Sequence, residues 1–87
     1  MEKTIICNWD TFTLNSPVYL CEDNHHTYLG DVNAENVIEE LTMYCVTTGA
    51  TNVHLFGLTN YVTFIRDSLL LNTATQYGLT NLKVEVN

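Results

Sequence analysis

A single glycine, Gly57, separates a short apolar stretch from a polar one in the segment TNVHLFGLTNYV, residues 51–62. A strand, a glycine and a helix in this order can hold a phosphate group at the helix N-terminus. Phosphate-binding loops use several glycines and usually a lysine, however, and this segment has one glycine and no lysine. A tight turn into a helix with Thr59 as its N-cap accounts for Gly57. We therefore predict no phosphate, nucleotide or other cofactor site here.

Acidic side chains that could hold metal ions are the second candidate. Metal-dependent nucleases gather several carboxylates around two ions. Asp10 follows the first apolar segment, but the apolar residues 52–57 include no acid. The nearest other carboxylates fall on expected helices, at no spacing that requires them to converge on Asp10: Glu35, Glu39, Glu40 and Asp67. We predict that Asp10 is a bend or strand-end residue and that the protein is not an enzyme.

Cysteine and histidine provide two more candidate sites. Cys21, His25 and His26 lie close together across an expected turn, but structural zinc needs four ligands at ordered spacings, and the turn also allows Cys21 and His26 to face opposite sides of a sheet. We predict exposed histidines and no metal. Cys45 falls on an apolar helical face and His54 on an apolar strand, a pattern typical of core residues rather than of a nucleophile with its base.

The charge balance excludes one class of function and leaves another open. Three basic residues stand against ten acidic ones, for a formal net charge of -7. Binding to a nucleic-acid backbone needs clustered Lys and Arg, so direct nucleic-acid binding is excluded. The acids either form a solvated surface or form a face that binds a partner with a basic groove, where they would imitate nucleic acid.

The elements that position these residues follow from periodicity and turn residues. We expect strands over residues 4–14, 18–22, 25–30, 51–57 and 81–87, the second and third joined by a tight Asp23-Asn24 turn. A first helix is expected between an Asn33 N-cap and a Gly49 C-cap, with Glu35 in its first turn. A second helix is expected over residues 60–77, closed by Gly78. The strand over residues 51–57 is apolar enough to be buried on both faces apart from His54.

The order of these elements, β-β-β-α-β-α-β, predicts the fold class. It is an α/β (α+β) fold in one domain, residues 1–87, with a mixed sheet and two helices. The first three strands favour antiparallel pairing, and strands separated by single helices favour parallel pairing. The topology is similar to a minimal core of the ribonuclease H-like and actin-like folds, and this resemblance implies a degenerate nuclease or nucleotide-binding domain as one possible origin.

A surface is the remaining candidate. The chain has one tryptophan, five tyrosines and three phenylalanines, many rings for a small core. On the second helix, Phe64 and Leu71 form a second apolar stripe beside the core-facing one that includes Tyr61. Either the two helices pack together and bury both stripes, or a partner covers one of them.

We therefore expect a small acidic, non-enzymatic protein-binding module. It resembles the accessory proteins of bacteriophages, and a phage-type inhibitor that occludes a basic groove on a host protein is the specific expectation. The contact residues would be Glu22, Asp23, Glu35, Glu39, Glu40, Tyr61, Phe64 and Leu71.

Two alternatives remain. One is a homo-oligomeric structural protein that pairs through the final strand, LKVEV, or through the hairpin edge, with the second helix at the seam. The other is the degenerate ribonuclease H-like or nucleotide-binding domain. We read neither a signal peptide nor a membrane span, and three cysteines without a CxxC motif favour free thiols in the cytoplasm, or in the host cytoplasm if a phage encodes the protein.

Overall fold

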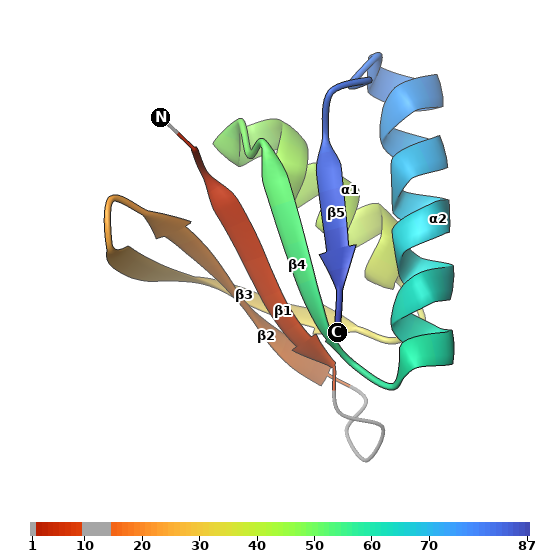
Figure 1. Ribbon diagram of the computed structural model, residues 1–87, viewed down its shortest axis with the longest axis horizontal. Coiled ribbons are helices and arrows are strands. Elements are labelled where there is room, and N and C mark those ends of the chain that lie inside the picture. The colour runs from red at the N-terminus through yellow and green to blue at the C-terminus, as the bar shows by residue number, and fades with distance from the viewer. Residues whose placement is uncertain (1, 10–14) are drawn as a thin grey trace.

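The computed structural model describes residues 2–9 and 15–87 (Figure 1). Two helices and five strands follow one another in the expected order: β1 (Thr4–Trp9), β2 (Asn15–Glu22), β3 (His25–Asn33), α1 (Val37–Thr48), β4 (Asn52–Gly57), α2 (Thr59–Tyr77) and β5 (Lys83–Val86). The first strand was expected to continue to residue 14. Asp10 and the bend predicted near it lie outside the described residues.

The five strands form one mixed sheet in the order β3-β2-β1-β4-β5. β1, β2 and β3 pair antiparallel, whereas β4 pairs parallel with β1 and with β5. The predicted fold class is therefore confirmed, including the change from antiparallel to parallel pairing where helices begin to connect the strands.

The β2–β3 hairpin turns at the two residues that the sequence indicates. Asp23 and Asn24 have φ values of 49° and 67°. Short polar side chains tolerate this left-handed region, and a two-residue turn of this kind matches the twist of the flanking strands. The turn places Glu22 opposite His25 and Cys21 opposite His26.

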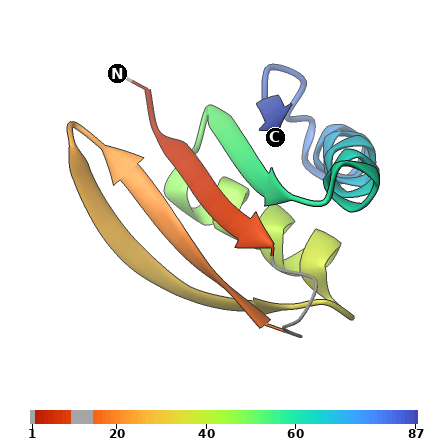
Figure 2. The same ribbon diagram turned by 60° about the horizontal axis from the view of Figure 1, so that its bottom comes forward.

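Both helices cover the same face of the sheet (Figure 2). The chain passes from β3 through α1 to β4, and from β4 through α2 to β5, in one direction along the sheet. Right-handed crossovers that advance in one direction lie on one face. The core forms between this face and the helices, and it includes Ile5, Leu55, Leu41 of α1 and Ile65 of α2.

The prediction that residues 51–57 are buried on both faces is wrong. Val53 and Leu55 are fully buried beneath the helices, but Asn52, His54 and Phe56 are only half-buried, because no element covers the other face among the described residues. The ring of His54 stacks on Phe56 with 4.2 Å between centroids.

The C-terminal ends of both helices lie where the sequence predicts them, but the N-terminal ends do not. Gly49 and Gly78 adopt the expected left-handed conformation, with φ of 72° and 68°. Asn33 is still part of β3, however, and α1 begins only at Val37. The Asn33 side chain instead accepts the N–H of Glu35 at 2.8 Å, so that Glu35 precedes the helix.

The second helix begins one residue earlier than expected. Its N-cap is Leu58, and Thr59 is already helical, so the prediction of a Thr59 cap is wrong. Gly57 approaches β1 closely, and a Cβ atom at this position would collide with the carbonyl oxygen of Trp9. Its φ of 149° and this contact show that the glycine is required by strand packing.

Candidate protein interface

The outer surface of the two helices brings together most of the residues singled out in the sequence. α1 and α2 pack side by side, and two side-chain contacts join them. The Asn72 amide donates to the Thr42 hydroxyl at 2.8 Å, and the Tyr77 hydroxyl donates to the Met43 sulfur at 3.5 Å. These contacts fix the relative position of the helices and thus of the side chains that they present outward.

The second apolar stripe of α2 is not buried by this packing. Val62, Ile65 and Leu69 are fully buried, but Phe64 is 61% exposed and Leu71 is 66% exposed. Of the two alternatives left open by the sequence, burial of both stripes between the helices is therefore wrong. The helices do pack on one face, but the side-chain contacts between them are those of Asn72 with Thr42 and of Tyr77 with Met43, and the stripe stays in solvent.

A hollow of about 320 Å³ lies where the start of α1 meets α2. Glu35 and Glu39 line it from one side, and Tyr61 and Phe64 line it from the other. We call these four residues the acidic hollow. Glu39 also lines a neighbouring hollow together with Met43 and Tyr77. The same exposed acidic residue therefore borders both hollows, each of which includes an aromatic residue.

Two of the expected contact residues also have structural roles. The Glu40 carboxylate accepts the backbone N–H of Asn33 at 3.1 Å, which ties α1 to the end of β3. The Tyr61 ring lies 5.6 Å from that of Trp9, and burial raises the pKa of Tyr61. Both residues are therefore held in place before any partner arrives.

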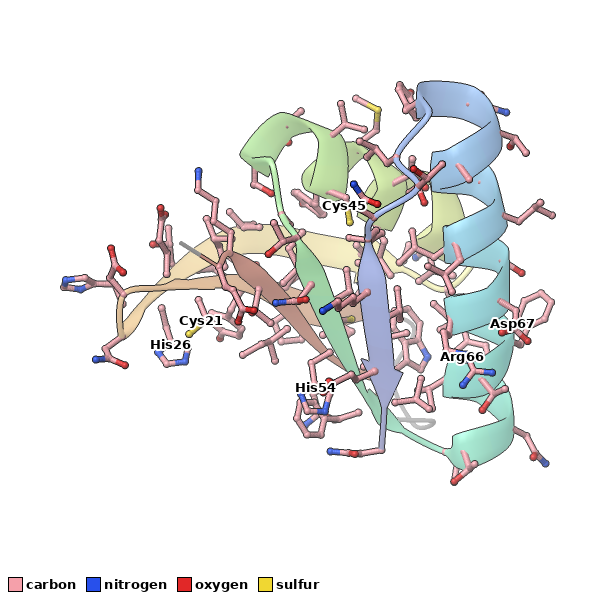
Figure 3. The ribbon with its side chains drawn as sticks, turned by 45° about the horizontal axis from the view of Figure 1, so that its top comes forward. Cys21, His26, Cys45, His54, Arg66 and Asp67 are labelled. Carbon is pink, nitrogen blue, oxygen red and sulfur yellow. The ribbon has the colours of Figure 1, made fainter. Side chains whose placement is uncertain are left out.

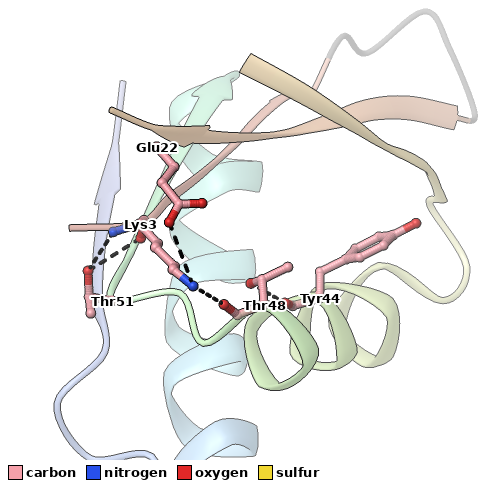
Figure 4. A network of polar contacts seen from close by, with 5 residues as sticks. All are labelled: Lys3, Glu22, Tyr44, Thr48 and Thr51. Carbon is pink, nitrogen blue, oxygen red and sulfur yellow. Dashed lines mark hydrogen bonds and ion pairs between the residues drawn. The ribbon is translucent and has the colours of Figure 1, made fainter. Parts of the chain in front are cut away.

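Glu22 and Asp23 lie apart from Glu39 and Glu40 of α1, at the tip of the hairpin and far from α2 (Figure 1). Glu22 is 3.8 Å from the ammonium group of Lys3, which also donates to the carbonyl oxygen of Thr48 at 3.3 Å (Figure 4). This ammonium joins the hairpin to the last turn of α1. The eight residues expected to form one contact surface thus occupy two separate regions.

Cys45 and His54 do not form a catalytic pair. Cys45 lies on the buried side of α1, and burial raises the pKa of its thiol to about 12. His54 lies on the opposite face of the sheet, so the two side chains point away from each other (Figure 3). Cys7 is also buried, and its pKa is raised by burial.

Cys21 and His26 occupy the same face of the sheet, so the prediction that allowed them to face opposite sides is wrong (Figure 3). A two-residue turn places them directly opposite each other, and opposed residues of an antiparallel pair share a face. His25 and His26 are exposed, as predicted. Within residues 2–9 and 15–87, no group of three or more His, Cys, Asp or Glu side chains is placed to hold a metal ion.

Met43 and Tyr77 belong to this surface but were not singled out by sequence reasoning. Both are 47% exposed. Met43 falls between charged and core-facing positions of α1, and Tyr77 is the last residue of its helix, so neither belongs to a periodic stripe. Only the contact between the helices brings them together. Neither helix in the described part of the chain is long and apolar enough to cross a membrane.

Neither a family model nor a curated protein matches the sequence. Among solved structures, the chain is similar to the Aquifex aeolicus member of the Ppx/GppA protein family, with 10% sequence identity and a TM-score of 0.45. The alignment covers 99% of this chain and 35% of that one, so the chain spans about a third of the length of that protein. Shared chemistry does not follow from a likeness of this kind.

Proposed function

We propose that the protein is a non-enzymatic binding module whose acidic hollow takes up an arginine side chain from a basic segment of another protein. One observation carries the proposal: Glu35 and Glu39 line the same hollow as Tyr61 and Phe64. Carboxylates and an aromatic face are the two groups that a guanidinium ion binds best.

The chemistry of the hollow favours arginine over lysine. A guanidinium group is planar, donates two parallel hydrogen bonds to a carboxylate and stacks on an aromatic ring. Phe64 offers an exposed ring, and Glu39 is an exposed carboxylate beside it. A lysine ammonium would satisfy a carboxylate but would gain less from the ring because it is more strongly hydrated.

The surroundings of the hollow support a contact with a protein. Met43 and Tyr77 add exposed apolar area around Glu39, and Leu71 adds exposed apolar area on the outer stripe of α2. Aromatic and Met side chains are enriched at the centre of protein interfaces, and the rim around them is polar. The net charge of -7 would attract a basic partner from a distance and raise the association rate.

The biological role that fits this chemistry is occlusion. A module that covers a basic groove competes with the nucleic acid that the groove would otherwise bind, and a phage-type accessory inhibitor is the role that we propose on this basis. We place the protein in the cytoplasm, or in the host cytoplasm if a phage encodes it. The three cysteines that remain free thiols support this compartment.

An arginine-rich peptide tests the proposal. We expect binding that perturbs the amide NMR signals of Glu39 and Phe64, and a lysine-rich peptide of equal charge should bind more weakly. Glu39→Gln and Phe64→Ala should each weaken binding about tenfold, which corresponds to about 1.4 kcal/mol for a lost charged contact or ring contact.

Asp23→Asn is the matched control, because it removes one negative charge at the far end of the molecule and suits the positive φ of the turn. It should leave the affinity within about twofold of the wild type. Equal losses in Asp23→Asn and Glu39→Gln would mean that net charge alone attracts the peptide. An affinity that stays constant between about 50 and about 500 mM salt would also contradict the proposal.

A further inference from the structure

The outward edge of β5 carries hydrogen-bonding groups in a fixed pattern. Lys83 donates its backbone N–H to Thr51 at 3.1 Å, and Asn87 donates to Leu55 at 3.0 Å and accepts from Gly57 at 3.2 Å. Backbone groups of successive residues in a strand point alternately to the two sides. The N–H and C=O groups of Val84 and Val86 therefore point away from β4, where no other strand pairs with them among the described residues.

The charges on β5 follow the same alternation. Lys83 and Glu85 flank Val84, both side chains are exposed, and both lie on the face that the helices leave uncovered. In the register of the sheet, Glu85 lies opposite His54 and Lys83 lies opposite Asn52. Neither Lys83 nor Glu85 has an ion-pair partner in the part of the chain that the structure describes.

We propose that β5 pairs antiparallel with β5 of a second copy of this chain, with Val84 directly opposite Val84 of the partner. This arrangement is symmetric, so the same strand serves on both sides of a two-fold axis. Val84 exchanges both of its outward hydrogen bonds with its counterpart in the second copy. The result is a ten-stranded sheet with all four helices on one side.

The charges select this register. With Val84 opposite Val84, Lys83 lies opposite Glu85 of the second copy and Glu85 lies opposite its Lys83. These are positions without mutual hydrogen bonds, where side chains approach most closely. Of the two neighbouring registers that satisfy the outward groups, one places Lys83 opposite Lys83 and the other places Glu85 opposite Glu85. Like charges in direct opposition disfavour both.

The other edge of the sheet is less suited to the same pairing. β3 carries an irregularity opposite Val18 and Tyr19, where Gly30 has a φ of 139°. A bulge bends and twists an edge strand away from a flat partner. β5 has no such interruption in its register with β4.

Four-residue strands give a small interface, so we expect a transient dimer with a dissociation constant on the order of 10–100 µM. Sedimentation equilibrium of the full chain measures it. Lys83→Glu and Glu85→Lys each replace two attractive pairs by two repulsive ones and should weaken dimerisation about tenfold. The double variant Lys83→Glu/Glu85→Lys restores the opposite charges and should return the constant to within about threefold of the wild type.

A proline variant tests the backbone contact separately. Val84→Pro removes one outward N–H and none of the bonds to β4, so it should abolish the dimer while circular dichroism shows a folded chain. His26→Pro is the control, because it removes an outward N–H at the β3 edge and should leave the dimer intact.

Three results would overturn the proposal. The first is a wild-type chain that stays monomeric up to about 1 mM, well above the expected constant. The second is single charge variants that dimerise like the wild type. The third is a dimer that Phe64→Ala abolishes and Lys83→Glu does not, since this would place the contact on the helices.

Discussion

Gly57 shows how one residue type serves two different requirements. A glycine between a strand and a helix can allow a phosphate to approach the backbone. In this protein the group that approaches is the carbonyl oxygen of Trp9 on the neighbouring parallel strand. The glycine is therefore explained by the packing of β4 against β1, without a ligand.

Replacing Gly57 by alanine should lower the free energy of unfolding by about 3 kcal/mol, through backbone strain of about 1 kcal/mol and a clash with Trp9 of about 2 kcal/mol. Gly49→Ala provides the matched control. Its φ is also positive, but a Cβ atom there meets nothing within 4 Å, so only the strain of about 1 kcal/mol applies. Urea denaturation of both variants measures the difference, and equal losses would show that the contact with Trp9 is unimportant.

Cys45 should make stability depend on alkaline pH. Its thiol pKa is raised from 9.0 to about 12 in the folded protein, so between these values the unfolded chain loses a proton that the folded chain keeps. The free energy of unfolding should then fall by about 1.4 kcal/mol per pH unit, whereas below pH 9.0 the contribution is fully present.

The Cys45→Ala variant should lack this part of the pH dependence, even though it is less stable at neutral pH because a buried atom is lost. Denaturation at about pH 8 and about pH 11 provides the comparison. If the wild type and the variant lose the same amount between the two pH values, the Cys45 thiol is not held protonated by the fold.

Among the elements, α2 carries two apolar stripes, one of which is buried and the other exposed. Leu69 and Ile65 are completely buried against the sheet, whereas Phe64 and Leu71 remain in solvent. A helix that is apolar on two sides usually has a neighbour on each. In this fold α1 contacts α2 through Asn72, which leaves the outer stripe available.

Substitutions on the two stripes should therefore differ in their effect on stability. Phe64→Gln and Leu71→Gln should change the free energy of unfolding by less than about 0.5 kcal/mol, as expected for surface positions. Leu69→Ala should cost about 2–5 kcal/mol, because it opens a cavity in the core. Thermal or urea denaturation measures these changes. A large loss of unfolding free energy in Leu71→Gln would mean that the outer stripe is part of the core.

Local sequence patterns predict that a helix forms more reliably than they predict the residue at which it begins. The ends of the two helices show why. Gly49 and Gly78 were recognised because a left-handed C-cap is a local backbone requirement. Asn33 has the side chain of an N-cap, but its backbone pairs with Asn15 of β2, and this long-range pairing delays the helix until Val37. A sequence window around Asn33 does not include Asn15, so local patterns do not show the strand pairing that delays the start of the helix.

For the molecule as a whole, the excess of acids is spread over both ends. Glu39 lies in the acidic hollow, and Glu22 lies by the hairpin tip with Lys3. The ion pairs of the described residues, Lys3–Glu22 and Arg66–Asp67, are partly exposed and contribute little to stability. Repulsion among the remaining acids therefore outweighs attraction.

Added salt should for this reason stabilise the protein. Between about 20 and about 500 mM sodium chloride, screening of the repulsion should raise the melting temperature by about 4 °C, which corresponds to about 0.5–1 kcal/mol for a domain of this size. The same salt change at about pH 4.5, where the net charge is close to zero, is the control and should have a smaller effect. A melting temperature that falls with salt at neutral pH would show that attractive pairs dominate.

The amino-acid sequence is sufficient to predict the elements, their order and the class of fold, because helical and strand periodicity, turn residues and glycine caps act over a few residues. It also determined which acids and rings are candidates for a contact surface. Cys45 as a core residue was likewise predictable from neighbouring positions, whereas the requirement for Gly57 comes from the distant Trp9.

Which of these residues lie close together depends on the packing of the helices and the sheet. Crossovers of one hand that advance in one direction place both helices on the same face, so one side of β4 is left uncovered, and the outer stripe of α2 lies in solvent. The same arrangement joins Glu35 and Glu39 to Tyr61 and Phe64, and separates them from Glu22 and Asp23. These distances depend on contacts between residues far apart in the chain, which local patterns do not encode.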